Sequence, residues 1–100
     1  MKGKGGYVYI VTNWTKSVLY TGVCANLSSR AHQHKIGEGS TFTRRYKCKY
    51  LVYYEFHDSI EDAIQREKQI KKWKREWKER LINEFNPTWR DLYNDVREMQ

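Results

Sequence analysis

Two segments near the N-terminus, each rich in β-branched and aromatic residues, place the strongest constraint on how this chain can fold. Tyr7 to Thr12 and Val18 to Val23 have the composition of β-strands, and the turn-prone segment Asn13 to Lys16 lies between them. Two strands joined by so short a connection pair most simply with each other. The sequence therefore predicts that the chain begins with a β-hairpin.

The rest of the sequence alternates between helical patterns and one further strand. Asn26 can cap the first helix, and Ser59 and Asp62 have the spacing of a capping box at the start of a long one. The pair Asn86-Pro87 ends the helical pattern, because a residue before proline is pushed out of helical geometry. The expected elements are a helix at 27–36, a helical turn at 43–47, a strand at 50–56, a helix from 60 to 77 or beyond, a helical segment ending at 84 and a short helix at 91–98. A small sheet covered by helices predicts an α+β fold.

One hundred residues with 39% hydrophobic content suffice for one small domain, which we expect to span residues 1–100. No apolar run approaches the roughly 20 residues that a membrane span needs. Cys24 and Cys48 lie far apart and form no C-x-x-C pair, so we expect two free thiols. Together these features predict a cytoplasmic protein without a membrane segment, and nothing in the sequence indicates an obligate protein partner.

The charge balance indicates the partner more directly. Nineteen Lys and Arg against twelve Asp and Glu give a formal net charge of +7, and the isoelectric point is near 9.5. A surface field of this sign attracts polyanions, and the eight tyrosines add possible stacking surfaces. The composition therefore favours nucleic acid as the partner.

Glu67 is an acidic residue in an apolar helical pattern. At 100° per residue it falls within a stripe of apolar side chains, so its carboxylate should face the sheet. The stripe consists of Ile60, Ala63, Ile64, Ile70 and Trp77. A buried carboxylate is costly unless it is paired, which leaves three interpretations: a salt bridge to a basic residue, a side chain that reaches water, or a metal ligand.

A basic stripe is expected on another side of the same helix. Its members, at i, i+3, i+4, i+7 spacing, are Lys68, Lys71, Lys72, Arg75 and Lys78. The stripe is either a solvated face with local ion pairs or a surface that contacts phosphates.

The first helix also turns polar groups inward. Arg30 and His34 share a face with Leu27 and Ala31, whereas His32 points elsewhere. On the hairpin, strand alternation lets Tyr9 and Tyr20 converge. Gly22 beside them offers a close backbone approach where a side chain would block a ligand.

At these residues the chain resembles the GIY-YIG nuclease superfamily, most closely its small single-domain bacterial members, which are similar to the catalytic domain of the excision-repair endonuclease. The resemblance runs over about residues 6–92. The segments that carry it are Tyr7-Val8-Tyr9, Tyr20-Thr21-Gly22, Asn26 to Arg30 followed by His34, Phe42 to Tyr46, Ala63 to Lys68, and Asn86 to Leu92.

The sequence departs from the family pattern at three positions. Tyr7 replaces the first glycine of the name-giving motif, and Thr21 replaces the usual isoleucine; a strand tolerates both. Val23 stands where repair-type members carry a lysine. The site is therefore one cation short at the phosphate, unless His34 or a nearby lysine supplies the charge.

The resemblance implies a three-stranded antiparallel sheet flanked by helices, and hydrolysis of DNA phosphodiester bonds with Mg²⁺ or Mn²⁺. In this reading Glu67 holds the metal ion, Arg30 contacts the scissile phosphate and Tyr9 is the general base. Tyr20 and His34 orient or deprotonate the attacking water, and Gly22 and Asn86 are candidates for positioning. The residues expected to contact nucleic acid are Arg44, Arg45, Lys68, Lys71, Lys72 and Arg75.

The implied chemistry is consistent with these residue types. Phosphodiester cleavage builds negative charge on oxygen atoms, which a divalent cation and an arginine stabilise. A free phenol has a pKa near 10. Because Arg30 and the metal ion favour the phenolate of Tyr9, activity should rise toward alkaline pH.

We expect a structure-selective rather than sequence-selective endonuclease of DNA repair or recombination. Two alternatives remain. One is a non-catalytic nucleic-acid-binding module on the same fold, and the other is a protein-interaction domain that uses Trp73, Trp77 and Trp89 as anchors.

Overall fold

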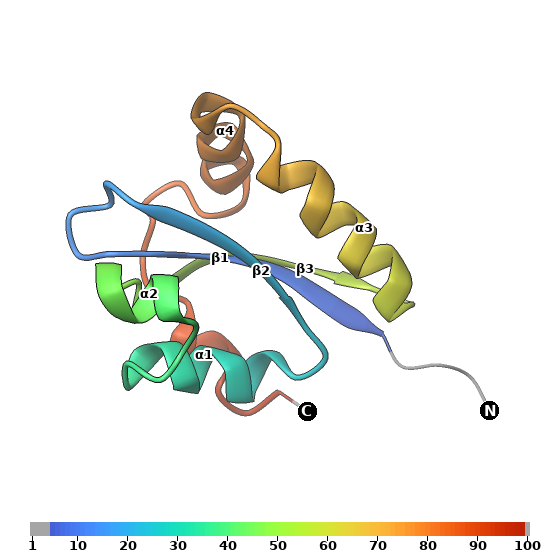
Figure 1. The fold of residues 1–100 in the computed structure, drawn as a ribbon, viewed down its shortest axis with the longest axis horizontal. Helices are drawn as coiled ribbons and strands as arrows, with labels where there is room; N and C mark the ends of the chain where they lie inside the picture. The colour runs from blue at the N-terminus through green and yellow to red at the C-terminus, as the bar shows by residue number, and fades with distance from the viewer. Residues whose placement is uncertain (1–4, 100) are drawn as a thin grey trace.

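A computed structural model describes residues 5–99 of the chain. Its centre is a three-stranded antiparallel sheet in the order β2-β1-β3 (Figure 1), with β1 at Gly6–Thr12, β2 at Leu19–Cys24 and β3 at Tyr50–His57. Strands β1 and β2 form the predicted hairpin, in which Tyr9 pairs with Gly22. The α+β fold and the three-stranded sheet are confirmed.

Five helices cover the two faces of this sheet, as Figure 1 shows. Helices α1 (Leu27–Lys35), α2 (Thr41–Tyr46) and α5 (Tyr93–Val96) lie on one face, and α3 (Ile60–Lys71) and α4 (Arg75–Phe85) lie on the other. Within residues 5–99, none of these helices has the length and apolar content to cross a membrane.

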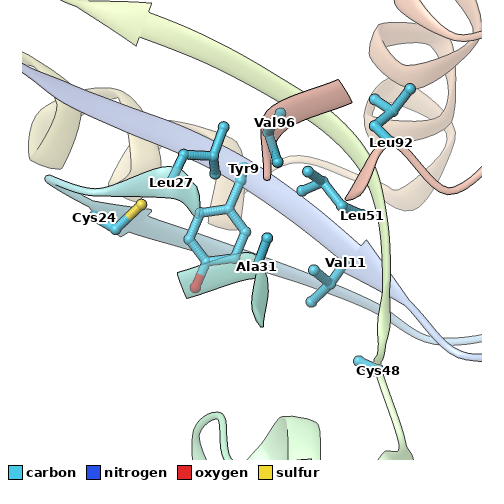
Figure 2. Close-up of a cluster of buried hydrophobic side chains, with 9 residues drawn as sticks. All are labelled: Tyr9, Val11, Cys24, Leu27, Ala31, Cys48, Leu51, Leu92 and Val96. Carbon is cyan, nitrogen blue, oxygen red and sulfur yellow. The ribbon is translucent and has the colours of Figure 1, made fainter. Parts of the chain in front are cut away.

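Side chains of the central strand alternate between two apolar clusters. Tyr9 and Val11 face α1 and α5, where Leu27, Ala31 and Val96 pack around them (Figure 2). Val8 and Ile10 face the opposite way, toward buried residues of α3 and α4 that include Ala63, Ile70 and Ile82. A register shift between Ile10 and Val11 lets Val52 and Tyr53 of β3 both join this second side. Strand β1 therefore holds both halves of the core together.

The predicted helix caps are present. Asn26 Oδ1 accepts a hydrogen bond from the Ser29 amide at 3.0 Å, and Ser59 Oγ accepts one from the Asp62 amide at 3.1 Å. These bonds satisfy amide groups that the first turn of a helix leaves free. They fix where α1 and α3 begin, and thus where the inward-facing side chains of both helices point.

The prediction of a continuous helix from Ile60 to Trp77 is wrong. Helix α3 ends at Lys71, the amides of Lys72 and Trp73 bond to carbonyls three residues back, and Lys74 has an extended backbone (ψ 153°) before α4 starts. Neither glycine nor proline causes the break. It turns the chain so that Ile82 of α4 can be buried against the sheet, and this packing outweighs the helix propensity of the sequence.

The break also changes which residues share a face. Trp77 belongs to α4 and is exposed, and Ile64 lies outside the buried face of α3, which consists of Ala63 and Ile70. The predicted basic stripe is split as well, since Arg75 and Lys78 lie on α4. The helical segment predicted to end at 84 ends at Phe85, the last short helix lies within the predicted 91–98, and the turn predicted at 43–47 is helix α2.

Candidate active site

Tyr9 is the most deeply buried of the candidate residues. Its side chain is 1% exposed and lies across Gly22 on the neighbouring strand. A Cβ atom at position 22 would collide with Tyr9 Oη and lie 2.5 Å from Tyr9 Cζ. Gly22 is therefore required by the Tyr9 ring. The space beside Gly22 that we expected a ligand to occupy is filled by this phenol.

His34 of α1 is the hydrogen-bond partner of Tyr9. Tyr9 Oη lies 2.9 Å from His34 Nε2, and His34 is 3% exposed. Its Nδ1 atom is buried without a hydrogen-bond partner among residues 5–99, and Gly39 lies against it, where a Cβ atom would collide. Burial and, to a smaller degree, the charge of Arg30 lower the pKa of His34 to about 4, so the imidazole is neutral at pH 7.

Arg30 lies half-buried beside this pair. Burial raises the pKa of Tyr9 strongly, and the nearby Arg30 guanidinium opposes that rise without cancelling it. Arg30 does favour the Tyr9 phenolate, as expected from the sequence, but the pKa of Tyr9 is raised on balance. Desolvation of the phenolate is the larger effect, and Tyr9 stays protonated at neutral pH.

Tyr20 is the more accessible of the two tyrosines. It is half-buried on β2, the edge strand, and shares with Tyr9 the sheet face that α1 covers. Its ring centroid lies 6.2 Å from that of His34, and it stacks on Phe42 of α2 at 5.6 Å. Lys71 Nζ lies 5.3 Å from its ring centroid. Tyr20 therefore links the buried Tyr9–His34 pair to the surface.

Glu67 reaches the cluster from α3, on the other side of the β2 edge. Its side chain is 12% exposed, and its Oε2 atom forms a salt bridge with Lys71 Nζ at 2.9 Å. The predicted position on the inward stripe of α3 is correct, and the salt-bridge interpretation describes the contact that the structure contains. Through Lys71, the carboxylate is connected to Tyr20.

A divalent cation fits the chemistry of this carboxylate. Mg²⁺ takes few protein oxygens, keeps several waters and is usually held by one or two carboxylates together with phosphates of the substrate, so the carboxylate of Glu67 on α3 is a ligand of the right kind. The competing ammonium belongs to an exposed lysine, and a helical i, i+4 pair of this kind is worth only about 0.3–0.5 kcal/mol. Among residues 5–99, no group of three or more His, Cys, Asp or Glu side chains could hold a metal ion without further ligands.

Asn86 and Arg75 form hydrogen bonds outside the cluster around Tyr9 and Tyr20. The buried Asn86 amide donates hydrogen bonds to the carbonyls of Val52 at 3.1 Å and Arg90 at 2.9 Å, so it fixes the chain after α4. The Arg75 guanidinium donates to the carbonyls of Lys16 and Ser17, both at 2.8 Å, and thus ties α4 to the hairpin turn. Arg75 is engaged within the protein. Four other residues that were expected to contact nucleic acid are exposed: Arg44, Arg45, Lys68 and Lys72.

Sequence reasoning missed three features of this cluster. Phe42 was noted only within a motif segment, yet it stacks on Tyr20. Gly39 lies between the helix predicted at 27–36 and the turn predicted at 43–47, and the structure places it against His34 Nδ1. Lys71 was placed on a surface stripe, yet it contacts both Glu67 and Tyr20. Its i, i+4 spacing from Glu67 was the one signal in the sequence that could have indicated this.

Comparison with known proteins identifies the class. The model of the GIY-YIG catalytic domain matches residues 5–83, and the chain therefore belongs to this family of nucleases. Similar proteins include the UPF0213 proteins of Staphylococcus aureus strains Mu50 and N315, each 36% identical over 78 residues, which cover 78% of this chain and 94% of each relative. No solved structure matches the chain.

Proposed function

We propose that this protein is a divalent-metal-dependent endonuclease that hydrolyses DNA phosphodiester bonds in the cytoplasm, with residues 1–100 acting as one domain. The observation that carries the proposal is the position of Tyr20 on β2 of a nuclease-family fold, near Arg30 of α1 and near Lys71 of α3, the salt-bridge partner of Glu67. The small size of the domain leaves little surface for reading bases, which favours structural over sequence selectivity. The resemblance to the catalytic domain of the excision-repair endonuclease supports a role in DNA repair.

Tyr20, rather than Tyr9, is the better candidate for activating water. A general base must reach the attacking water, and Tyr9 is sealed in the core with a raised pKa. Tyr20 is half-buried, and both Arg30 and Lys71 interact with it electrostatically. The Tyr20 hydroxyl would first lose its proton to solvent, and the resulting phenolate oxygen would take the water proton while the water oxygen attacks phosphorus. The bond to the leaving oxygen then breaks, and that oxygen takes a proton from solvent.

The remaining residues would bind and orient. Arg30 would donate hydrogen bonds to the non-bridging phosphate oxygens, where negative charge builds. Tyr9 and His34 hold α1 against the hairpin, which sets the distance between Arg30 and Tyr20. Glu67 would hold the Mg²⁺ or Mn²⁺ ion, which when bound supplies a Lewis acid for the phosphate oxygens.

The test is cleavage of end-labelled nicked and branched DNA with Mg²⁺, with Mn²⁺ and with EDTA. The wild type should cut only with a metal ion, and Glu67→Ala should bind the DNA but not cut it. Glu84→Ala, which removes an exposed carboxylate from α4, is the matched control and should cut like the wild type.

Cleavage by Glu67→Ala at the wild-type rate would rule out Glu67 as the metal ligand. Binding without cleavage by the wild-type protein, under every metal condition, would instead favour the non-catalytic nucleic-acid module.

A further inference from the structure

The lysine of α3 that contacts Glu67 has two neighbours at once. Lys71 Nζ lies 2.9 Å from Glu67 Oε2 and 5.3 Å from the ring centroid of Tyr20. The side chain of Lys71 is 46% exposed, whereas that of Glu67 is 12% exposed. A long, flexible and solvated cation is thus paired with a fixed, mostly buried anion. Of the two partners, the ammonium is the one that can move.

The backbone that carries Lys71 is held in place by the packing of its neighbour. Ile70, the preceding residue, is fully buried against Val8, Ala63 and the partly buried Val23 of β2. Val23 itself therefore contributes apolar packing at the β2 edge and carries no charge there. The turn of α3 that packs on Val23 is the turn that presents Lys71.

Other basic side chains near this edge are committed elsewhere or lack these contacts. Arg75 is bonded to the hairpin turn and to Glu79, and Lys35 is paired with Asp91 on the far side of α1. Arg30 and Lys71 both interact electrostatically with Tyr20, and Lys71 Nζ lies over its ring. A phosphate bound beside Tyr20 would therefore lie near Lys71 as well as Arg30.

We propose that Lys71 is a catalytic residue that exchanges partners: its ammonium neutralises Glu67 in the metal-free protein and contacts the scissile phosphate when a divalent cation takes the carboxylate. The proposal rests on the endonuclease function proposed above. No proton moves in the exchange, because one cation replaces another at Glu67 and the lysine stays charged. The released ammonium remains within reach of Tyr20, and so supplies the positive charge that Val23 does not.

The exchange predicts that Lys71→Ala strengthens metal binding but slows cleavage. Without its competitor, the metal ion should bind Glu67 about twofold more tightly, as expected for loss of a partly exposed i, i+4 ion pair. The cleavage rate at saturating metal and DNA should nevertheless fall at least about tenfold, because one charge at the transition state is missing. A lysine that merely stabilised the helix, or merely bound DNA, would not strengthen metal binding.

The experiment titrates Mn²⁺ into the DNA-free protein by calorimetry and measures single-turnover cleavage of the same protein. The variants are Lys71→Ala, Lys71→Arg and the control Lys74→Ala, which removes an exposed lysine from the α3–α4 connection. Lys71→Arg should keep the wild-type metal affinity and recover most of the cleavage rate. Lys74→Ala should match the wild type in both measurements.

Two results would overturn the exchange: wild-type cleavage by Lys71→Ala at saturating metal and DNA, or metal binding by Lys71→Ala that is unchanged or weaker. Failure of the wild type to cut would instead refute the endonuclease function, and the calorimetric comparison would still report whether Lys71 and the metal ion compete for Glu67.

Discussion

At the scale of single residues, the buried His34 makes the fold sensitive to acid. In the folded protein the pKa of His34 is about 4, against about 6.5 in an unfolded chain. The unfolded state therefore binds the proton first as the pH falls from 6.5 to 4, and stability is lost over this range. The groups that face the imidazole are Tyr9, Tyr20, Arg30 and the Thr43 side of α2.

We expect the free energy of unfolding of the wild type to drop by about 3 kcal/mol more than that of His34→Gln between pH 7 and pH 4. Glutamine does not titrate, so the difference isolates the imidazole from the carboxylates, which titrate in both proteins. Denaturant unfolding at a series of pH values measures it. Parallel stability curves for the two proteins would show that His34 is not held neutral by the fold.

Gly22 should tolerate no side chain. In Gly22→Ala the new methyl group meets the Tyr9 ring, and the strand or the ring must shift, at a cost of about 1–3 kcal/mol. Because the shift also displaces Tyr9 from His34, cleavage should fall together with the melting temperature. Gly37→Ala is the comparison: a Cβ atom at position 37 would make only an ordinary contact with Lys49 Cε at 3.9 Å, but φ is 81°, so backbone strain alone should cost about 1 kcal/mol there.

At the scale of elements, one ion pair attaches α3 to the sheet. Arg66 donates to both oxygens of Glu55 on β3, at 2.9 and 3.4 Å, and its guanidinium lies 5.2 Å from the Trp73 ring centroid. Burial alone would raise the pKa of Glu55, but its hydrogen bonds with Arg66, Tyr53 and His57 lower it on balance. The pair fixes the helix turn that also carries Glu67.

Arg66→Ala should cost about 1–3 kcal/mol of stability, because a half-buried carboxylate loses its charged partner. It should also slow cleavage without weakening DNA binding, since it acts through the position of Glu67. Gln65→Ala, on the exposed side of the same helix, should do neither. Thermal unfolding and single-turnover kinetics of the two variants separate these expectations. Equal stability of both variants would mean that the ion pair does not anchor α3.

The elements themselves were largely predictable, and the exception has a tertiary cause. The hairpin, β3 and the start of α3 follow from strand composition and from caps at Asn26 and Ser59, all of which are local signals. The position at which α3 ends is not set by a local signal in the sequence. The segment around Trp73 has strong helix formers, and the chain bends there because Ile82 is buried on the sheet, a contact that no pattern within the helix encodes.

At the scale of the whole molecule, the net charge of +7 should dominate the affinity for DNA. If the four exposed cations Arg44, Arg45, Lys68 and Lys72 each contact a phosphate, the logarithm of the association constant should fall with the logarithm of salt concentration with a slope of about −3 to −4. Fluorescence anisotropy in EDTA measures this slope. Arg45→Ala should make it less steep by about one, whereas Arg75→Ala should leave it unchanged.

The composition of the site could be predicted from sequence, but its internal arrangement could not. Helix and strand periodicity turned Tyr9, Arg30, His34 and Glu67 inward. Which phenol is sealed and which is reachable depends on how α1 and the Gly39 loop close over the sheet, and thus on packing between distant segments. For the same reason we propose Tyr20, and not Tyr9, as the general base.

The middle position of β1 has a consequence for biosynthesis. Along the chain β1 precedes both of its neighbours, and β3 is translated only after helices α1 and α2. Until then Val8 and Ile10 cannot be enclosed, and the carboxylate of Glu67 has not yet been translated. The two sides of the core, and the side chains proposed to act in catalysis, therefore come together only after β3 and α3 have been made.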